Sequence, residues 1–466
     1  MERKAPKEVN YQDILPLAIP SSSNRRKFMP QNGQTFSPNG TNIIRIDVNA
    51  DSMLDASHSY LQVDLTNTDP TAASALAPDV GCPFIKRLRI ESGGITLEDT
   101  FEYGRLMALL EYAQFAPDNF TQEYSVLMSQ SQKLSDIPAG AAAAQAVINQ
   151  PCYNDVVRGG LNGGGRITTG ATKTYCIPLV SAIMNCEKYL PLILMNAGLT
   201  IELTLAPACE IGCWTTTADP TTGLTSGNYS LTNVAYVAHL VDMDRSFYDA
   251  LRGEMSLSGS VAIHGQTWKH YGSSIAANEQ SPVINIPARA KSIKSIFSTF
   301  RESATSANTA QSTQKFSTGV FQRQQIQSWQ YKVGSVAYPQ ASVAVSATQL
   351  APTLCEVLKA FGKLGDISTN TLFSAVSFGA NTEDAGCGLV GSGQLGSNLQ
   401  NFCIAYDCEG FQKSALESGI NTAERALPIS LELTSGGVAY VVKNDNYVCA
   451  DAFFYVNADG TLTPSS

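Results

Sequence analysis

The chain has 466 residues, which exceeds the size of about 250–300 residues at which a single hydrophobic core stops growing, so at least two domains are expected. Charged residues make up 15% of the sequence, and the formal net charge is −9. This charge argues against a protein whose main work is to hold nucleic acid, because phosphate binding needs a cationic surface. The low charged fraction suggests surfaces that are buried against neighbouring subunits.

Residues 1–28 are predicted to form a basic N-terminal arm. Its cations are Arg3, Lys4, Lys7, Arg25, Arg26 and Lys27, against Glu2, Glu8 and Asp13. Such an arm fits an inward contact with a genome or an internal membrane, and a solvated terminus is the simpler alternative. The charged N-terminus lacks the apolar stretch of a secretory signal. We therefore expect most of the 11 cysteines to be reduced and buried, as in a protein made and kept inside a cell.

Alternation of apolar and polar residues predicts half-buried strands in both halves of the chain. In chain order they lie at residues 42–48, 60–65, 85–92, 199–205, 233–244, 293–300, 327–333, 430–434 and 446–460. Turn residues interrupt the chain often, as at Ser37-Pro38-Asn39-Gly40 and Ser435-Gly436-Gly437. Many short strands with frequent turns indicate β-sandwiches or barrels.

Three short helices are predicted between the strands. The first covers residues 101–115, with leucines at helical spacing, and the second covers residues 245–255, with Asp244 as its cap and Gly253 near its end. The third follows Thr353, which together with Glu356 has the spacing of a capping box, and Gly365 can end this helix.

Three pairs of segments recur in the same order in the two halves and indicate an internal duplication. Residues 85–92 resemble 293–300, residues 191–205 resemble 426–434, and residues 233–244 resemble 446–460. The predicted domains are therefore the arm, a first β-sandwich at 29–252 and a second at 253–466. Long polar loops rich in Gly, Ala and Ser separate the strands, as at 139–146 and 379–397.

The residues that often carry chemistry do not form a recognisable catalytic or metal pattern. The four histidines are not at ligand spacing, and the cysteine pairs Cys209/Cys213 and Cys403/Cys408 lack the four converging ligands of a zinc finger. Residues 165–170 have two glycines at phosphate-loop spacing, but Ala171 and Thr172 stand where that loop needs a lysine and a hydroxyl. We expect no catalytic, cofactor-binding or metal-binding residues, and no enzyme activity.

Acidic residues cluster at several places, which are interpreted as helix starts where the helix dipole favours anions. These residues are Glu98, Asp99, Glu102, Asp242 and Asp244. A further pair, Glu383 and Asp384, lies in a glycine-rich loop but lacks the spaced oxygen ligands of a specific Ca²⁺ site.

The sequence resembles the double jelly-roll major capsid proteins of polinton-like viruses, virophages and related DNA viruses. In the second half the resemblance lies in residues 286–297, 329–340 and the ending FFYVNADGTLTPSS; in the first half it lies in residues 45–61 and 97–106. It implies an all-β fold of two tandem eight-stranded jelly rolls. It also implies a homotrimer with a pseudo-hexagonal outline, which tiles an icosahedral shell around a DNA genome and contacts neighbouring capsomers, penton proteins and minor capsid proteins in the virion.

Two other functions remain open at this point. A β-sandwich adhesin, spike or fibre protein could bind glycans through Trp214, Trp268 and Trp329, although the alternation around Trp329 favours a core position. A glycosidase on a similar scaffold would need two carboxylates facing each other across a groove, and no local pattern favours one.

Overall fold

The computed structural model describes most of the chain. The described residues are 20–69, 74–76, 82–114, 127, 167–186, 188–211, 213–215, 228–303, 318–346, 349–365, 373, 378, 389–390, 394–395, 401–410, 418–423 and 427–465. Several features considered from sequence lie wholly or largely outside these residues: the expected loops at 139–146 and 379–397, Gly165 and the pair Glu383–Asp384.

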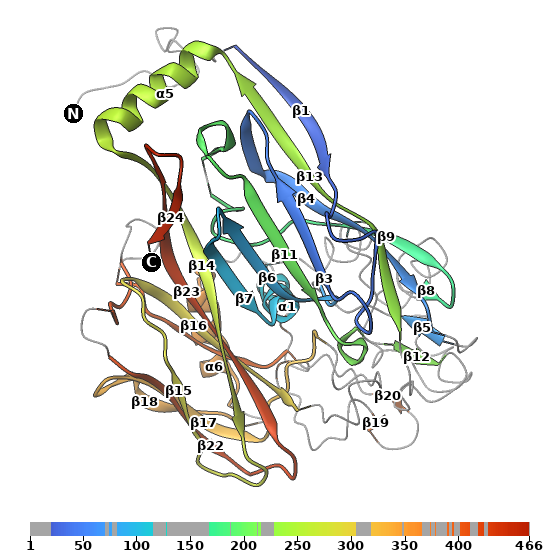
Figure 1. The fold of residues 1–466 in the computed structure, drawn as a ribbon. Coiled ribbons are helices and arrows are strands. Elements are labelled where there is room, and N and C mark those ends of the chain that lie inside the picture. The colour runs from blue at the N-terminus through green and yellow to red at the C-terminus, as the bar shows by residue number, and fades with distance from the viewer. Residues whose placement is uncertain are drawn as a thin grey trace, which may run out of the picture.

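The first β-sandwich consists of two antiparallel sheets (Figure 1). The main strands of one sheet are, in spatial order, β1 (Ser21–Phe28), β13 (Tyr229–Met243), β4 (Met53–Asn67) and β9 (Thr172–Ile177). The other sheet contains β3 (Ile43–Val48), β11 (Leu199–Leu205), β6 (Ile85–Ser92) and β7 (Ile95–Phe101). Shorter elements accompany them: β2 (Thr35–Phe36), β10 (Leu190–Pro191), the small sheet of β5 (Ser74–Leu76), β8 (Ile167–Thr168) and β12 (Cys213–Thr215), and the 3-10 turns η3 (Leu192–Leu194) and η4 (Ala208–Glu210).

The second β-sandwich repeats this plan. One sheet contains β14 (Ser260–Ile275), β23 (Val442–Asn457), β16 (Ile293–Glu302) and β21 (Cys403–Asp407). The other contains β15 (Val283–Ile286), β22 (Ile429–Ser435), β17 (Ile326–Val333) and β18 (Val336–Ala344). The remaining strands are β24 (Leu462–Ser465), which pairs with β23, and the hairpin of β19 (Leu389–Val390) and β20 (Gln394–Leu395).

The two sandwiches have the same strand order when their eight main strands are numbered along the chain from one to eight. In both, the spatial order is 1-8-3-6 in one sheet and 2-7-4-5 in the other. This is the eight-stranded jelly roll, and its occurrence twice in tandem confirms the predicted all-β fold.

One of the three sequence pairs that indicated the duplication was wrong. In the strand order, β11 corresponds to β22 and β13 to β23, as predicted, but β6 corresponds to β17 and β16 to β4. The segments 85–92 and 293–300 therefore lie in sheets that do not correspond. The sequences of the two segments are similar because apolar residues alternate with polar ones in both, as they do in any half-buried strand.

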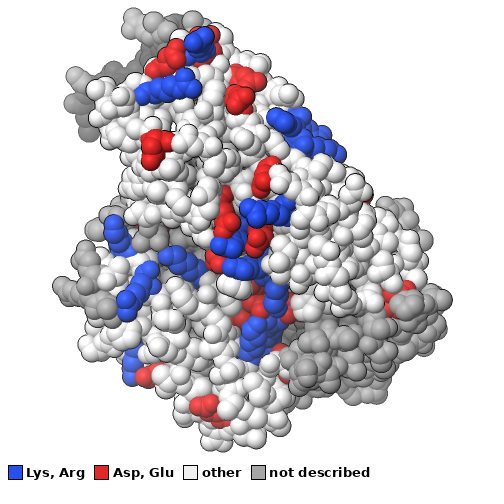
Figure 2. Space-filling model, viewed as in Figure 1, with Lys and Arg blue, Asp and Glu red and all other residues white. Residues whose placement is uncertain are grey.

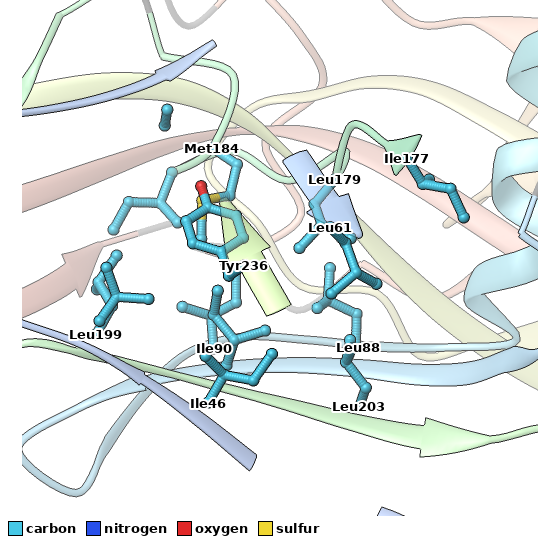
Figure 3. Packing of buried hydrophobic residues seen from close by; sticks show 14 of the residues in the cluster. Ile46, Leu61, Leu88, Ile90, Ile177, Leu179, Met184, Leu199, Leu203 and Tyr236 are labelled. Atoms are coloured by element: carbon cyan, nitrogen blue, oxygen red, sulfur yellow. The ribbon is translucent and has the colours of Figure 1, made fainter. Parts of the chain in front are cut away.

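The apolar residues of the alternating patterns that predicted the strands fill the cores of the sandwiches. In β11 the pattern LTIELTL buries every second residue, and β3 behaves in the same way. Figure 3 shows Ile46 and Ile90 from one sheet of the first sandwich pointing toward Leu61 and Tyr236 of the other. Sheets that bury one face in this manner interdigitate their side chains across a shared core.

The three predicted helices are present, with corrected ends. Helix α1 (Tyr103–Gln114) begins two residues later than predicted, because Phe101 ends strand β7. Helix α5 (Arg245–Ser258) continues through Gly253 and ends at Gly259, which adopts the left-handed conformation with φ 80°. Asp244 caps α5 as predicted, since its side chain accepts a hydrogen bond from the Ser246 N–H.

The predicted capping box at the start of the third helix was wrong. Helix α6 (Ala351–Ala360) begins two residues before Thr353 and ends well before Gly365. The Thr353 hydroxyl is buried and accepts a hydrogen bond from Trp329 Nε1 at 3.0 Å instead. A buried indole N–H needs a hydrogen-bond acceptor, and the Thr353 hydroxyl serves as that acceptor for Trp329 and does not cap the helix.

The predicted boundaries of the arm and the two domains stay predictions. The segment 21–28, placed in the arm, forms β1 and pairs along its whole length with β13. Helix α5 spans the point at which the first domain was predicted to end. Within the described part of the chain, no helix is long and apolar enough to cross a membrane.

Candidate functional site: the junction between the sandwiches

Charged side chains gather where the two sandwiches meet. Figure 2 shows acidic and basic atoms together in a band across the middle of the molecule. The ion pairs that join the two sandwiches here involve Glu102, Arg105 and Glu210 from the first, and Arg301, Lys443 and Asp445 from the second. Lys86 of the first sandwich adds ion pairs with Glu102 and Glu210 of its own sandwich. We call this set the junction charge cluster.

Asp445 is the deepest member of the cluster, because its side chain is fully buried. Its Oδ2 lies 3.2 Å from Arg105 Nε and 3.3 Å from Arg301 Nε, and its Oδ1 lies 3.0 Å from His270 Nε2. Burial alone would raise the pKa of Asp445, but Arg301, the His270 hydrogen bond and Arg105 outweigh it and hold that pKa well below its usual range. The carboxylate is therefore ionised and surrounded by cations.

Glu102, just before α1, is a second buried carboxylate that binds several cations. Arg301 Nη2 and Lys86 Nζ lie 2.9 and 2.8 Å from its carboxylate, and Lys443 forms a third ion pair with it. Burial raises the pKa of Glu102, but the charges of Arg301, Lys86 and Lys443 outweigh this effect and lower the pKa to about 2. One carboxylate of the first sandwich thus binds two cations of the second.

Arg105 and Arg301 are held by more than charge. The Arg105 guanidinium donates to the backbone oxygens of Thr318 and Val320 across the junction, at 3.2–3.3 Å. Arg301 Nη1 donates to Glu210 Oε1 at 3.1 Å. Multiple donors in a fixed plane suit arginine for a buried pair of this kind. The cluster therefore specifies orientation as well as contact.

Apolar packing and close backbone approach complete the junction. Helix α1 belongs to the first sandwich by sequence, but Leu106, Leu109 and Leu110 join the hydrophobic core of the second. Strand β7 packs against β14, and Thr100 Oγ1 donates to the Trp268 backbone oxygen at 3.0 Å. At Gly265 on β14, an added Cβ would lie 2.4 Å from the Ala182 backbone oxygen, so only glycine fits there.

The interpretation of the acidic cluster at 98–102 as a helix start was wrong for Glu98 and Asp99. Both lie in β7, and Asp99 forms a bidentate pair with Arg87 on the neighbouring strand. Glu98 is buried and accepts hydrogen bonds from the amides of Ala182 and Ile183, at 2.9 and 3.2 Å. Burial raises the pKa of Glu98, and those amide hydrogen bonds oppose the rise. Asp242 likewise lies in β13.

Of the other residues considered from sequence, His58 and His239 lie next to each other, with ring centroids 6.0 Å apart. His58, His264 and His270 pair with Asp55, Asp451 and Asp445 respectively, and no group of three metal-ligating side chains occurs among the described residues. Cys403 and Cys408 are buried free thiols, whose pKa burial raises, while the side chains of Cys209 and Cys213 lie outside the described part.

Sequence reasoning missed the junction charge cluster. A signal was present, because Asp445 and Arg301 interrupt strands that are otherwise buried along much of their length. Buried charges of this kind are paired, but the sequence does not say with what, since Arg105 and Asp445 are separated by most of the chain.

Comparison with known proteins identifies the fold. No family model matches the chain, and no curated protein sequence matches it. Among solved structures, a chain of the Sputnik virophage determined by cryo-electron microscopy matches with a TM-score of 0.57 and 12% identity, covering 100% of this chain and 93% of that one. The mavirus major capsid protein matches with 0.51 and 10%, covering 100% and 95%, and the Faustovirus major capsid protein with 0.51 and 12%, covering 96% and 92%. The resemblance stated from sequence is thus confirmed at the level of fold.

Proposed function

We propose that the chain is the major capsid protein of a DNA virus and that its role in the virion is structural. The observation that carries the proposal is the match of both tandem jelly rolls, over nearly the whole chain, to major capsid proteins such as that of mavirus. The junction charge cluster supports it, because its buried ion pairs hold the two sandwiches of the chain together as one unit. A regular shell is built from repeated units of this kind.

The proposed assembly unit is a homotrimer with a pseudo-hexagonal outline. Two sandwiches of the same topology in each chain place six similar units around a threefold axis, so a trimer can occupy a six-coordinated position in an icosahedral shell. Neighbouring capsomers, penton proteins and minor capsid proteins are its proposed partners. The proposed inward contact of the arm with a genome or internal membrane fits the exposed Arg25, Arg26 and Lys27 on β1.

The proposed function is not enzymatic. The contacts of the junction charge cluster are between the chain's own side chains and backbone, which is the arrangement of a structural lock. Of the three tryptophans considered for glycan binding, Trp329 cannot contact a sugar, because it is fully buried in the core of the second sandwich.

Light scattering after gel filtration tests the proposal. We expect a mass three times the 49.8 kDa of the chain and six-sided particles in negative-stain images of the same peak. A monomer at every concentration, with or without calcium, would contradict the capsid proposal and give priority to glycan-binding and hydrolase assays.

A further inference from the structure

A large β-bulge interrupts β4, an inner strand of the first sandwich. In the ladder of β4 with β13, the four residues 56–59 stand opposite the single residue Ala238. The corresponding strands of the second sandwich, β16 and β23, deviate by one extra residue only, Lys294. The jelly roll therefore does not require the larger bulge. Bulges of this kind redirect side chains and are frequent next to functional sites.

The bulge brings the side chains of Asp55 and His58 together. In a regular strand, two residues three positions apart point to opposite faces of the sheet. Here the buried Asp55 carboxylate accepts a hydrogen bond from Ser57 Oγ at 2.7 Å, and its Oδ2 lies 2.7 Å from His58 Nδ1. Burial raises the pKa of Asp55, but the hydrogen bonds from Ser57 and His58 outweigh this effect and hold the pKa below its usual value. The carboxylate is ionised and accepts, so Nδ1 of His58 carries the proton.

The second ring nitrogen of His58 is available to a ligand. The His58 side chain is 74% exposed, and its Nε2 forms no hydrogen bond within the described part of the chain. A neutral imidazole that donates from Nδ1 keeps a lone pair at Nε2, which is the form that binds metal ions. A carboxylate that accepts from the other nitrogen, as Asp55 does, is the usual partner of a metal-ligating histidine.

His239 lies next to His58 on the neighbouring strand. The residues on either side of it, Ala238 and Leu240, belong to the core, so His239 points to the outer face of the sheet. Its backbone N–H donates to Ser59 Oγ at 3.0 Å, and its ring forms no hydrogen bond with the described residues. The ring centroids of His58 and His239 are 6.0 Å apart. Because zinc–nitrogen distances are about 2.0–2.1 Å, two imidazoles on one zinc ion have centres about 5–6 Å apart. Small side-chain rotations therefore suffice to place both rings on one ion.

We propose that His58 and His239 bind a zinc ion on the outer face of the first sandwich, with Asp55 as the positioning residue for His58. Imidazole ligands favour Zn²⁺ and its neighbours Ni²⁺ and Cu²⁺ over Ca²⁺ and Mg²⁺, which prefer oxygen. Water completes the coordination, since the described residues offer no group of three metal-ligating side chains.

The charges around the proposed site are balanced. Arg25 pairs with His239 in the ladder of β1 with β13, and its guanidinium lies over the Tyr60 ring, 5.6 Å from the centroid. The ionised Asp55 offsets this positive charge. The site lies within one chain, so it does not depend on the proposed trimer.

Isothermal titration calorimetry of the purified full-length protein with zinc chloride at neutral pH tests the site. We expect saturable binding of one ion per chain. His58→Gln and His239→Gln should each weaken binding by at least about tenfold, because each removes one of two protein ligands. Asp55→Asn should weaken it about 10–100-fold through the loss of orientation. His264→Gln is the matched control and should bind as wild type, because His264 also pairs with an aspartate but its ring lies against Phe453.

Circular dichroism establishes which variants are folded, and the exposed His58 makes His58→Gln the decisive one. A wild-type protein without saturable zinc binding overturns the proposal. A folded His58→Gln variant that binds zinc as tightly as wild type overturns it as well, as does a His264→Gln variant that loses as much affinity as His58→Gln. A folded Asp55→Asn variant with unchanged affinity refutes the positioning role of Asp55. None of these results bears on the oligomeric state, which tests the proposed function.

Discussion

Replacing Asp445 by Asn removes the negative charge at the centre of the junction charge cluster while keeping the side chain's size. The carboxylate is fully buried, and Arg105 and Arg301 lie within 3.3 Å of it. Removing one partner of a buried ion pair leaves uncompensated charge and typically costs about 3–5 kcal/mol. We therefore expect Asp445→Asn to lower the free energy of unfolding by an amount in this range.

An exposed ion pair provides the control. Asp249 on α5 lies 3.9 Å from Arg252, and both side chains are more than half exposed. Exposed pairs contribute about 0–1 kcal/mol, so Asp249→Asn should change stability little. The assay is urea unfolding of the assembled protein at fixed concentration, followed by circular dichroism and by the fluorescence of the three tryptophans, one of which, Trp268, lies on the junction strand β14. Equal and small effects of the two substitutions would refute the account of the junction as a charge lock.

Other buried groups carry three further predictions. Because the folded pKa of Glu102 is depressed to about 2, its ionic contribution to stability is present above its usual pKa and is lost as pH falls toward 2. The difference in unfolding free energy between wild type and Glu102→Gln, measured by urea unfolding at stepped pH, should therefore shrink over that window. A difference that does not change with pH would contradict the assignment. Gly265→Ala should destabilise the protein by about 1–3 kcal/mol through a clash at the junction, whereas Gly253→Ala, in open space on α5, should stabilise it by about 0.5–1 kcal/mol; equal melting shifts would argue against the close approach. Thr353→Val should cost about 1–3 kcal/mol because it leaves the Trp329 indole N–H buried without its acceptor, and unchanged thermal melting would show that this hydrogen bond is dispensable.

The local part of the fold could be predicted from the sequence, because it depends on alternation and capping. The pattern IIRIDV predicts β3 from its residues alone, and Asp244 predicts the start of α5. The end of α5 was predicted too early, because Gly253 faces open space and the helix tolerates it. Local signals thus place elements well and their ends less well.

The junction could not be predicted in this way, since its contacts join residues that are far apart in the chain. Glu102 was identified as part of an acidic cluster, but nothing in the sequence around Arg301 or Lys443 says that these residues are its partners. The similarity of residues 85–92 to 293–300 was misleading because both satisfy the same alternation in different sheets. Topology, and not similarity of short strands, reveals which segments correspond.

The central claim is that three chains present six jelly rolls around one axis as a rigid capsomer. A cryo-electron microscopy map of the purified oligomer tests it most directly. The account predicts a threefold ring of six similar sandwiches, in which junctions within chains alternate with contacts between chains. A map with two sandwiches per particle, or with copies that do not form such a ring, would contradict the account.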